Sequence, residues 1–573
     1  MCRLYLYLLF LLMFDSIYAQ NKNHTTSFHP PVDIPIHLSG NFAELRSDHF
    51  HSGIDIRTQG ISGKKVYSID EGYVSRIKIQ TNGYGKSVYI NHPGGYTSVY
   101  GHLSSYSGKI DEYVKNYQYK NQTHTLDLYP AKNEIAVKKG EIIALSGNTG
   151  SSAGPHLHFE IRNSANQHPL NVLDFGFDIK DSRPPEIYGL YLYSFSGQGA
   201  RRTVAGRKEL YITHTGNMYR LQSDRPVEIN QPVSFGIEAY DFLDANRNRC
   251  GLYTIEVFIN DEIFYSFRTD EFSFAESRFI NSHTDYALRH LEDKRVHDLF
   301  RRPNNSLSMV KFEKNDGILN PLPGKEYQVK ILLSDVYGNK SQLDFTLTGN
   351  LSGEHLAEKD TGPDKLFQWD SDNEINNHVF KFFLPSKSLY EDTQVRYTRI
   401  EGGTDIHAYE HDLGDPSVPM HRAGRIMLKL ENGNTDPEKV CIVRRDEEGK
   451  WVSEGGEADT ENWISANIRE FGTFSLEVDT IPPEIQVVNL IRDADLRSAR
   501  NIRFIVQDEL SGISSYRGYI DNQWVLFEYD PKNDLVYYEF DKNRLKSGQK
   551  HELELYITDE RENTSVFHSM FFW

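Results

Sequence analysis

The chain has 573 residues, a formal net charge of -18 and an aromatic content of 12%, with 34 Tyr and 32 Phe. The length predicts about three to five domains. The acidity argues against a nucleic-acid partner, which favours a basic protein face. The aromatic residues are typical of β-strands, so we expect a mainly β fold.

The N-terminus has the layout of a secretory signal peptide. Arg3 precedes an apolar run from Leu4 to Phe14, and small residues follow as far as Ala19. This pattern predicts export with cleavage after Ala19. The run is shorter than the roughly 20 residues that a transmembrane helix needs. We therefore expect a signal peptide at 1–19, a location in the periplasm or cell envelope, and no stable membrane insertion after cleavage; an uncleaved anchor is the alternative.

Residues 50–57 read as a strand with one polar and one apolar face. If the segment is extended, His51, Gly53 and Asp55 point the same way, because side chains alternate with period 2. Gly53 has no side chain, so we expect open space between the imidazole and the carboxylate. Both groups can then converge on one ion.

Two later segments repeat this pattern of polar side chains on a strand. Residues 96–103 read as an alternating strand that ends beside His102. In residues 154–161, His156 and His158 share one face, while the intervening apolar residues share the other and can enter a core. After His102, residues 104–137 read as an inserted loop, either a wall of a cleft or ordinary surface.

The donor types in these segments suit zinc. A catalytic zinc ion takes three protein ligands, typically imidazole nitrogen or carboxylate oxygen, and keeps one position for water. His51, Asp55 and one histidine of the pair His156 and His158 would supply three ligands, leaving the other histidine beside the water. Glu160 lies on the same strand face, and we expect it to point away from the metal.

Three motifs resemble, in order and spacing, the signatures of the lysostaphin/LytM-type zinc metallopeptidases. They are His51-Ser-Gly-Ile-Asp55, Tyr100-Gly-His102-Leu103 and Gly154-Pro-His156-Leu-His158-Phe159. The preceding glycine-rich residues 144–150 also resemble this family. The resemblance covers roughly residues 30–178, and it implies an antiparallel β-sheet domain that hydrolyses peptide bonds in bacterial cell-wall peptidoglycan.

Carried over position by position, the resemblance implies that His51, Asp55 and His158 bind one Zn²⁺ and that His102 and His156 are catalytic. Zinc lowers the pKa of a bound water towards about 7 and polarises the scissile carbonyl. One catalytic histidine would accept the proton of the water and the other would stabilise the oxyanion. Which of the two is the base stays open. No expected residue is missing, which favours an active endopeptidase.

The sequence beyond residue 178 contains an internal repeat. Asp181-Ser-Arg-Pro-Pro-Glu-Ile187 is echoed by Asp479-Thr-Ile-Pro-Pro-Glu-Ile485. Two further pairs of strand-like segments continue the repeat. The segments of the first pair end at Asp241 and Asp508, and those of the second pair end at Asp335 and Asp559. Short alternating strands between turn signals predict immunoglobulin-like β-sandwiches. Residues 287–294 read as a short helix inserted in the first copy.

The predicted organisation places one peptidase domain before three β modules. The predicted ranges are a signal peptide at 1–19, a LytM-type zinc peptidase domain at 28–178, an Ig-like β-sandwich at 181–349, a β-rich module at 350–478 and an Ig-like β-sandwich at 479–573. For the C-terminal modules we favour a spacer or assembly role, with an envelope protein or a glycan as partner as the alternative.

Two function classes follow from these features. The first is an exported zinc metalloendopeptidase that cuts peptidoglycan peptide cross-links by a zinc-activated water assisted by two histidines. The alternative is a non-catalytic envelope protein that binds wall peptide or activates another hydrolase. A third reading, cleavage of glycine-rich host or matrix proteins, shares the site and differs in substrate. The scissile bond, the oligomeric state and any autoinhibition stay open.

Overall fold

The computed structural model describes residues 28–573 apart from 245–246, 351–363, 402–408, 432–434 and 491–493. The predicted signal peptide lies outside these residues. The secondary structure is mainly antiparallel β-strand, which confirms the expected fold class. Across the described part of the chain, no helix combines the length and apolar character needed to span a membrane.

We name four parts of the chain by their predicted ranges. They are the N-terminal domain (28–178), the first sandwich (181–349), the central module (350–478) and the last sandwich (479–573). In each of the last three parts, two larger sheets contribute buried residues to one hydrophobic core. The immunoglobulin-like topology and the exact domain boundaries stay predictions.

A nine-stranded antiparallel sheet forms the centre of the N-terminal domain. Its main path runs in the order β1 (Leu38–Gly40), β2 (Ile54–Arg57), β11 (His156–Asn163), β6 (Tyr96–Leu103), β5 (Lys86–Asn91), β4 (Gly72–Ile79), β8 (Leu126–Leu128). The apolar side chains of β11, Leu157, Phe159 and Ile161, are fully buried in the domain core. The polar side chains of this strand are therefore left for the opposite face.

The predicted loop at 104–137 contains helix α2 (Gly108–Asn121). Ile110 and Val114, four residues apart on one helix face, are buried in the core of the N-terminal domain. Gln122 ends the helix in the left-handed conformation, with φ 48°. The expectation of a loop is wrong for this part, because the apolar face of the helix covers core residues.

The first sandwich packs a four-stranded sheet against an eight-stranded sheet. The smaller sheet has the order β14 (Thr203–Leu210), β13 (Glu186–Ser196), β18 (Val233–Tyr240), β21 (Val296–Asp298). The path of the larger sheet is β15 (Ile212–Thr215), β16 (Met218–Leu221), β24 (Lys340–Gly349), β23 (Glu326–Ser334), β19 (Thr254–Ile259), β20 (Glu262–Arg268), β22 (Val310–Glu313), with β17 (Val227–Ile229) beside β24. Helix α4 (Tyr286–Glu292) confirms the predicted short helix.

The N-terminal domain and the first sandwich exchange segments. Phe42 and Phe50, which precede β2, are buried in the core of the first sandwich. In the other direction, Leu243 and Cys250 of the first sandwich are buried in the core of the N-terminal domain. The chain that leads to His51 is therefore held by a core outside its own sheet.

The central module and the last sandwich continue the β architecture. The central module has two larger sheets. The first has the order β26 (Asn373–Asn376), β27 (Phe380–Leu384), β31 (Gly424–Lys429), β35 (Trp463–Ile468), β34 (Glu457–Ala458). The second has the order β29 (Tyr397–Glu401), β30 (Tyr409–Leu413), β36 (Gly472–Val478), β32 (Val440–Arg445), β33 (Trp451–Ser453). One sheet of the last sandwich has the order β37 (Glu484–Val487), β39 (Asn501–Gln507), β43 (Leu535–Glu539), β42 (Phe527–Asp530). The other has the order β38 (Ala494–Asp495), β45 (Thr564–Phe572), β44 (Lys550–Asp559), β40 (Ile513–Ile520), β41 (Gln523–Val525).

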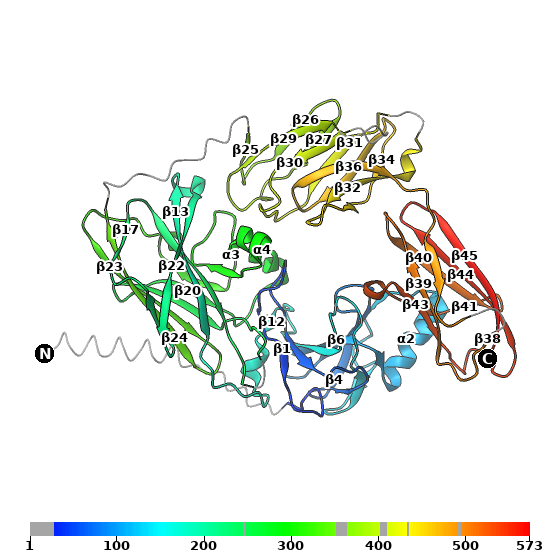
Figure 1. The fold of residues 1–573 in the computed structure, drawn as a ribbon. Helices are drawn as coiled ribbons and strands as arrows, with labels where there is room; N and C mark the ends of the chain where they lie inside the picture. Colours follow the sequence, from blue (N-terminus) through cyan, green and yellow to red (C-terminus); the bar gives the residue numbers. More distant parts are fainter. Residues whose placement is uncertain (1–27, 245–246, 351–363, 402–408, 432–434, 491–493) are drawn as a thin grey trace.

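The four parts contact one another in a ring, so that the last sandwich returns to the N-terminal domain (Figure 1). The Tyr390 hydroxyl of the central module donates to the Arg278 carbonyl of the first sandwich at 2.6 Å. Lys439 Nζ of the central module donates to Asn563 Oδ1 of the last sandwich at 2.7 Å. Successive modules of the chain therefore share polar contacts.

An ion pair closes the ring between β5 and β42. Lys86 Nζ lies 2.7 and 2.8 Å from the two carboxylate oxygens of Glu528, and the Tyr537 hydroxyl donates to the same carboxylate at 2.6 Å. Burial raises the pKa of Glu528, but the Lys86 ammonium outweighs this effect, and the pKa lies below its ordinary value. Glu528 is therefore a carboxylate that depends on Lys86 for its countercharge.

We expect Lys86→Met to weaken the closure of the ring. The change leaves a largely buried carboxylate without its cation, which costs about 1–3 kcal/mol once partial solvent access is allowed for. A lower chemical-denaturation midpoint, with faster hydrogen exchange in β42, is the expected result. Lys65→Met, at an exposed position of the same domain, is the control, and equal behaviour of the two variants would show that the ion pair contributes nothing.

Candidate metal centre

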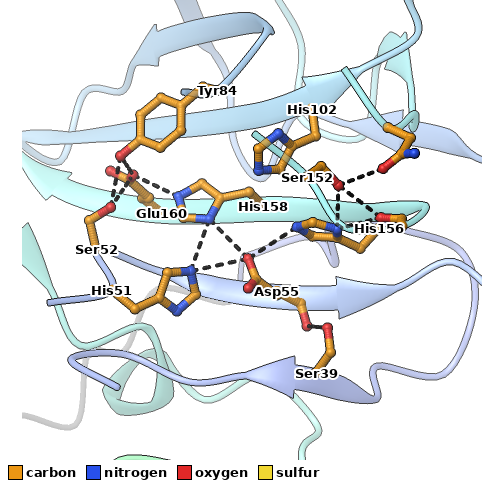
Figure 2. Close-up of polar contacts among 12 residues, drawn as sticks. Ser39, His51, Ser52, Asp55, Tyr84, His102, Ser152, His156, His158 and Glu160 are labelled. Atoms are coloured by element: carbon orange, nitrogen blue, oxygen red, sulfur yellow. Dashed lines mark hydrogen bonds and ion pairs between the residues drawn. The ribbon is translucent and has the colours of Figure 1, made fainter. Parts of the chain in front are cut away.

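Three side chains of the N-terminal domain converge on one point, as Figure 2 shows. His51 Nε2 lies 3.1 Å from Asp55 Oδ1 and 3.0 Å from His158 Nδ1, and His158 Nδ1 lies 3.0 Å from Asp55 Oδ1. The three residues are 5%, 7% and 3% exposed. Two imidazole nitrogens and one carboxylate oxygen therefore share a buried pocket.

The sheet register brings two of these residues together. Strands β2 and β11 are antiparallel neighbours, and Asp55 lies directly opposite His158, so the two side chains share a face. His51 lies before β2, because the strand begins only at Ile54. The predicted strand at 50–57 is therefore wrong over its first half, although His51 still reaches the pocket.

Gly53 serves close packing instead of leaving open space. A Cβ atom at this position would lie 2.3 Å from the Phe159 carbonyl oxygen and 2.8 Å from Glu160 Cγ. Any larger residue would push the chain away from β11. The expected gap between His51 and Asp55 is thus filled by the backbone of the neighbouring strand.

Hydrogen bonds orient both histidines of the pocket. His51 Nδ1 lies 2.7 Å from the Asn41 carbonyl oxygen, which only accepts, so Nδ1 carries the hydrogen and Nε2 faces the pocket. The Asn41 side chain is itself bound to the backbone of Gly251, at 2.7 and 2.9 Å. His158 donates from Nε2 to Glu160 Oε1 at 2.8 Å, which turns Nδ1 inward.

The Asp55 carboxylate is held in its charged form. Its Oδ1 faces the two histidines, and its Oδ2 accepts a hydrogen bond from Arg46 Nη2 at 2.7 Å. Burial raises the pKa of Asp55, but the contacts with His51, His156 and His158 outweigh burial, and the pKa lies well below its ordinary value. The carboxylate is therefore available as an anionic ligand near neutral pH.

The donor set of this pocket fits zinc. Zinc binds imidazole nitrogen and carboxylate oxygen at about 2.0–2.2 Å in tetrahedral sites. Such bonds place neighbouring donors roughly 3.3 Å apart, close to the observed separations of 3.0 and 3.1 Å. The second nitrogen of each histidine is occupied by a carbonyl or a carboxylate, as in zinc sites generally.

Glu160 does not point away from the pocket, and the expectation that it would is wrong. Its Oε1 accepts hydrogen bonds from His158, from the Tyr84 hydroxyl at 2.5 Å and from the Ser52 hydroxyl at 2.7 Å. Its Oε2 accepts from Arg162 Nε at 2.5 Å. Burial alone would raise the pKa of Glu160. The contacts with Arg162 and His158 have the larger effect, so the pKa of Glu160 lies below its ordinary value. A fully buried carboxylate thus holds His158 in place.

Two further histidines border the pocket. The rings of His102 and His156 have centroids 4.7 Å apart. His102 Nδ1 lies 2.8 Å from the Thr149 carbonyl oxygen, and His156 Nδ1 lies 2.8 Å from the Gly154 carbonyl oxygen. Both Nδ1 atoms therefore carry a hydrogen and donate it to backbone carbonyl oxygens. His156 Nε2 lies 3.4 Å from Asp55 Oδ1.

His102 has an unusual backbone conformation at the end of β6. Its φ is 56°, in the left-handed region that residues other than glycine seldom adopt. Gly101 lies opposite His158 on the neighbouring strand, so strict alternation would turn His102 to the core side. The left-handed turn changes this direction. Burial lowers the pKa of His102 to about 3, which keeps the ring neutral.

The structure thus brings all five predicted site residues to one side of the sheet. His51, Asp55 and His158 form the pocket, and His102 and His156 lie beside it. Their roles as metal ligands and catalytic groups stay predictions. Sequence reasoning did not assign a role to Tyr84, Ser52 or Arg162. The alternation of β11 carried a signal for Arg162, because it lies two residues after Glu160 on the same face.

Family models match two parts of the chain. The model described as Peptidase family M23 matches residues 49–119 and 116–172, which include all five predicted site residues. The model described as Zu5-like domain matches residues 364–479, within the central module.

Two solved structures of similar proteins each match less than a third of this chain. A zinc-containing peptidase from Vibrio cholerae is 26% identical, with a TM-score of 0.20, over 27% of this chain and 40% of that chain. The catalytic domain of lysostaphin from Staphylococcus simulans is 24% identical, with a TM-score of 0.17, over 22% of this chain and 78% of that chain.

Curated relatives match about a fifth of the sequence. An uncharacterized metalloprotease of Haemophilus influenzae is 37% identical over 123 residues, 21% of each chain. The DD-carboxypeptidase/endopeptidase Mpg of Neisseria meningitidis serogroup B is 32% identical over 127 residues, 22% of this chain and 23% of the relative. The chain thus spans about a fifth of the length of these relatives. At residues 49–172 the chain contains a metallopeptidase domain of family M23.

Proposed function

We propose that the protein is an exported zinc endopeptidase that hydrolyses peptide cross-links of bacterial peptidoglycan. The observation that carries this proposal is the convergence of His51, Asp55 and His158, with His102 and His156 on the same side. The names of two relatives agree with the substrate class, a DD-carboxypeptidase/endopeptidase and a peptidoglycan DD-endopeptidase of Vibrio cholerae. The predicted signal peptide supports export to the envelope.

In this proposal His51 Nε2, Asp55 Oδ1 and His158 Nδ1 hold the metal. When bound there, zinc supplies Lewis acidity that makes a water molecule more acidic and polarises a carbonyl group. The chain keeps its three donors in place through the Asn41 carbonyl, the Arg46 guanidinium and the Glu160 carboxylate. These contacts leave little freedom for the ligand side chains, so the site is ready before substrate arrives.

His102 and His156 supply the proton transfers of the proposed reaction. Each ring donates Nδ1–H to a backbone carbonyl, so Nε2 is the nitrogen that exchanges protons in the proposed reaction. Such a nitrogen accepts a proton from the attacking water, and the imidazolium that results donates a hydrogen bond to an oxyanion or to the leaving amine. The Asp55 carboxylate, 3.4 Å from His156 Nε2, would stabilise positive charge on His156.

A non-catalytic envelope protein is the second candidate function. The same pocket would then bind wall peptide without cutting it, and the C-terminal modules would bind an envelope protein or glycan. The complete set of five residues favours the enzyme, because a binding protein does not need two further imidazoles beside a metal site.

The test is hydrolysis of cross-linked muropeptides by the purified full chain. We expect mass spectrometry to detect cleaved peptide stems, loss of cleavage after zinc is removed by a chelator, and recovery after stoichiometric Zn²⁺ is added back. Binding of muropeptides without cleavage, at full zinc occupancy, would contradict the enzyme and support the binding protein. Cleavage of glycine-rich matrix peptides in place of muropeptides would overturn the substrate class alone.

A further inference from the structure

Three aspartates of the first sandwich converge at its junction with the N-terminal domain. Asp181 begins the short segment 181–185, here called the linker, through which the chain enters the first sandwich; Asp241 follows β18, and Asp335 follows β23. One carboxylate oxygen of each lies within 4.8 Å of the others. Three carboxyl groups thus meet at a point where two domains join.

The loop after β23 shapes this cluster. Asp335 Oδ1 accepts from the Asn339 backbone N–H at 2.8 Å, and Asp335 Oδ2 accepts from the Asn339 side-chain amide at 2.6 Å. The same amide reaches the Asp181 carbonyl oxygen at 3.4 Å. One asparagine therefore ties the loop to the linker and holds two of the three aspartates together.

Asp241 is buried in the cluster with one carboxylate oxygen unpartnered. Its side chain is 3% exposed, and its Oδ1 has no hydrogen-bond partner. The Oδ2 atom of Asp181 is likewise buried and without a hydrogen-bond partner. Burial, reinforced by the charges of Asp181 and Asp335, raises the pKa of Asp241 to about 8. A buried carboxylate is costly unless it is paired or binds a metal.

The last sandwich repeats this arrangement from a different part of the sequence. Asp479, Asp508 and Asp559 also place one carboxylate oxygen each within 4.8 Å of one another. Asn563 bonds Asp559 through its backbone N–H at 2.8 Å and through its side chain at 2.7 Å, and its side chain also reaches the Asp479 carbonyl at 3.2 Å. The Oδ1 atom of Asp508 has no hydrogen-bond partner.

We propose that Asp181, Asp241 and Asp335 form a binding site for Ca²⁺ that joins the linker to the first sandwich. The donors are carboxylate oxygens, the ligand type that hard divalent cations prefer, and Ca²⁺ accepts six to eight oxygens in flexible geometry. The unpartnered oxygens of Asp181 and Asp241 are the expected direct ligands. The repeated triad around Asp508 would bind Ca²⁺ in the same way in the last sandwich.

Calcium at this position would fix the junction between two domains. Asp181 belongs to the linker, whereas Asp241 and Asp335 end two strands of the sandwich that lie in different sheets. A shared cation replaces the mutual repulsion of the three carboxylates by attraction to one centre. The site is separate from the zinc ligands, so calcium binding can be measured without reference to peptidase activity.

The experiment uses the full chain, depleted of free cations and loaded with one zinc ion. Calorimetric titration with CaCl₂ should detect binding with a Kd on the order of 10⁻⁴–10⁻³ M or tighter, the range of extracellular calcium modules. Asp241→Asn should weaken the Kd at this site at least about tenfold, or remove one bound Ca²⁺ per chain. Asp181→Asn is the second variant. Asp224→Asn, in an exposed ion pair of the same sandwich, should bind as wild type.

Thermal unfolding separates a cation site from carboxylates that merely share protons. For wild type, Ca²⁺ should raise the midpoint, and MgCl₂ at the same concentration should raise it less, because Mg²⁺ loses its waters reluctantly. Without added cation, Asp241→Asn should be at least as stable as wild type, since repulsion is relieved. With Ca²⁺ it should become the less stable of the two. Identical calcium responses of wild type, Asp241→Asn and Asp181→Asn would overturn the proposal.

Discussion

His158→Ala should abolish both zinc binding and peptide hydrolysis. His158 contributes Nδ1 to the pocket and is the one ligand whose second nitrogen is held by a buried carboxylate, Glu160. Removing it leaves two donors, too few for the three protein ligands that a catalytic zinc site uses. Metal analysis of the purified variant should find little zinc, and cleavage of cross-linked muropeptides should fall to background.

His156→Ala should separate chemistry from metal binding. The ring lies beside the pocket, with Nε2 at 3.4 Å from Asp55 Oδ1, but it is not one of the three converging donors. We expect the variant to keep its zinc and to lose about 10²–10⁴-fold in kcat/KM, the usual contribution of a general acid or base. His102→Ala should behave in the same way if the two rings share the proton transfers.

The matched control is His168→Ala. His168 lies in the same domain and is half-buried in a contact with Glu271, so its loss should change neither zinc content nor rate. Full hydrolysis by both His156→Ala and His158→Ala would contradict the proposed site. Loss of zinc from His156→Ala would instead place His156 among the ligands.

The pocket was predictable from the sequence mainly because of one strand. In β11 the period-2 alternation puts Leu157 and Phe159 in the core and leaves His156 and His158 on the other face. The observed pairing of His158 with Asp55 follows from the same face rule, applied across two strands. Local pattern is enough where a regular strand with a buried face carries the side chains.

Alternation failed where the chain leaves regular structure. His51 precedes β2, and its neighbour Phe50 enters the core of the first sandwich instead of the core beneath β2. His102 reaches the pocket through a left-handed backbone turn, with φ 56°. The alternation of side chains along a strand predicts neither feature, because each depends on packing with distant parts of the chain.

Contacts between distant segments were also beyond local reasoning. The Asn41 carbonyl that orients His51 is fixed by the backbone of Gly251, more than 200 residues away. The ion pair of Lys86 and Glu528 joins the N-terminal domain to the last sandwich. Strand patterns predict the sheets, whereas the supports of the site come from tertiary structure.

Glu160→Gln should weaken both the metal site and the fold. Glutamine keeps the shape of the side chain but removes the negative charge that accepts from His158 and pairs with Arg162. Loss of such a partner typically lowers metal affinity or activity by about 10–100-fold. The buried Arg162 would lose its countercharge, which costs about 3–5 kcal/mol. Zinc competition with a chelator and chemical denaturation measure the two effects.

A double variant distinguishes orientation of the ligand from burial of charge. In Glu160→Gln/Arg162→Gln the unpaired guanidinium is gone, so much of the lost stability should return. Zinc affinity should stay low, because no carboxylate accepts from His158 Nε2. Glu71→Gln, at an exposed position of the same domain, is the control. If zinc affinity recovered together with stability, Glu160 would act on the metal only by neutralising Arg162, and its role in orienting His158 would be wrong.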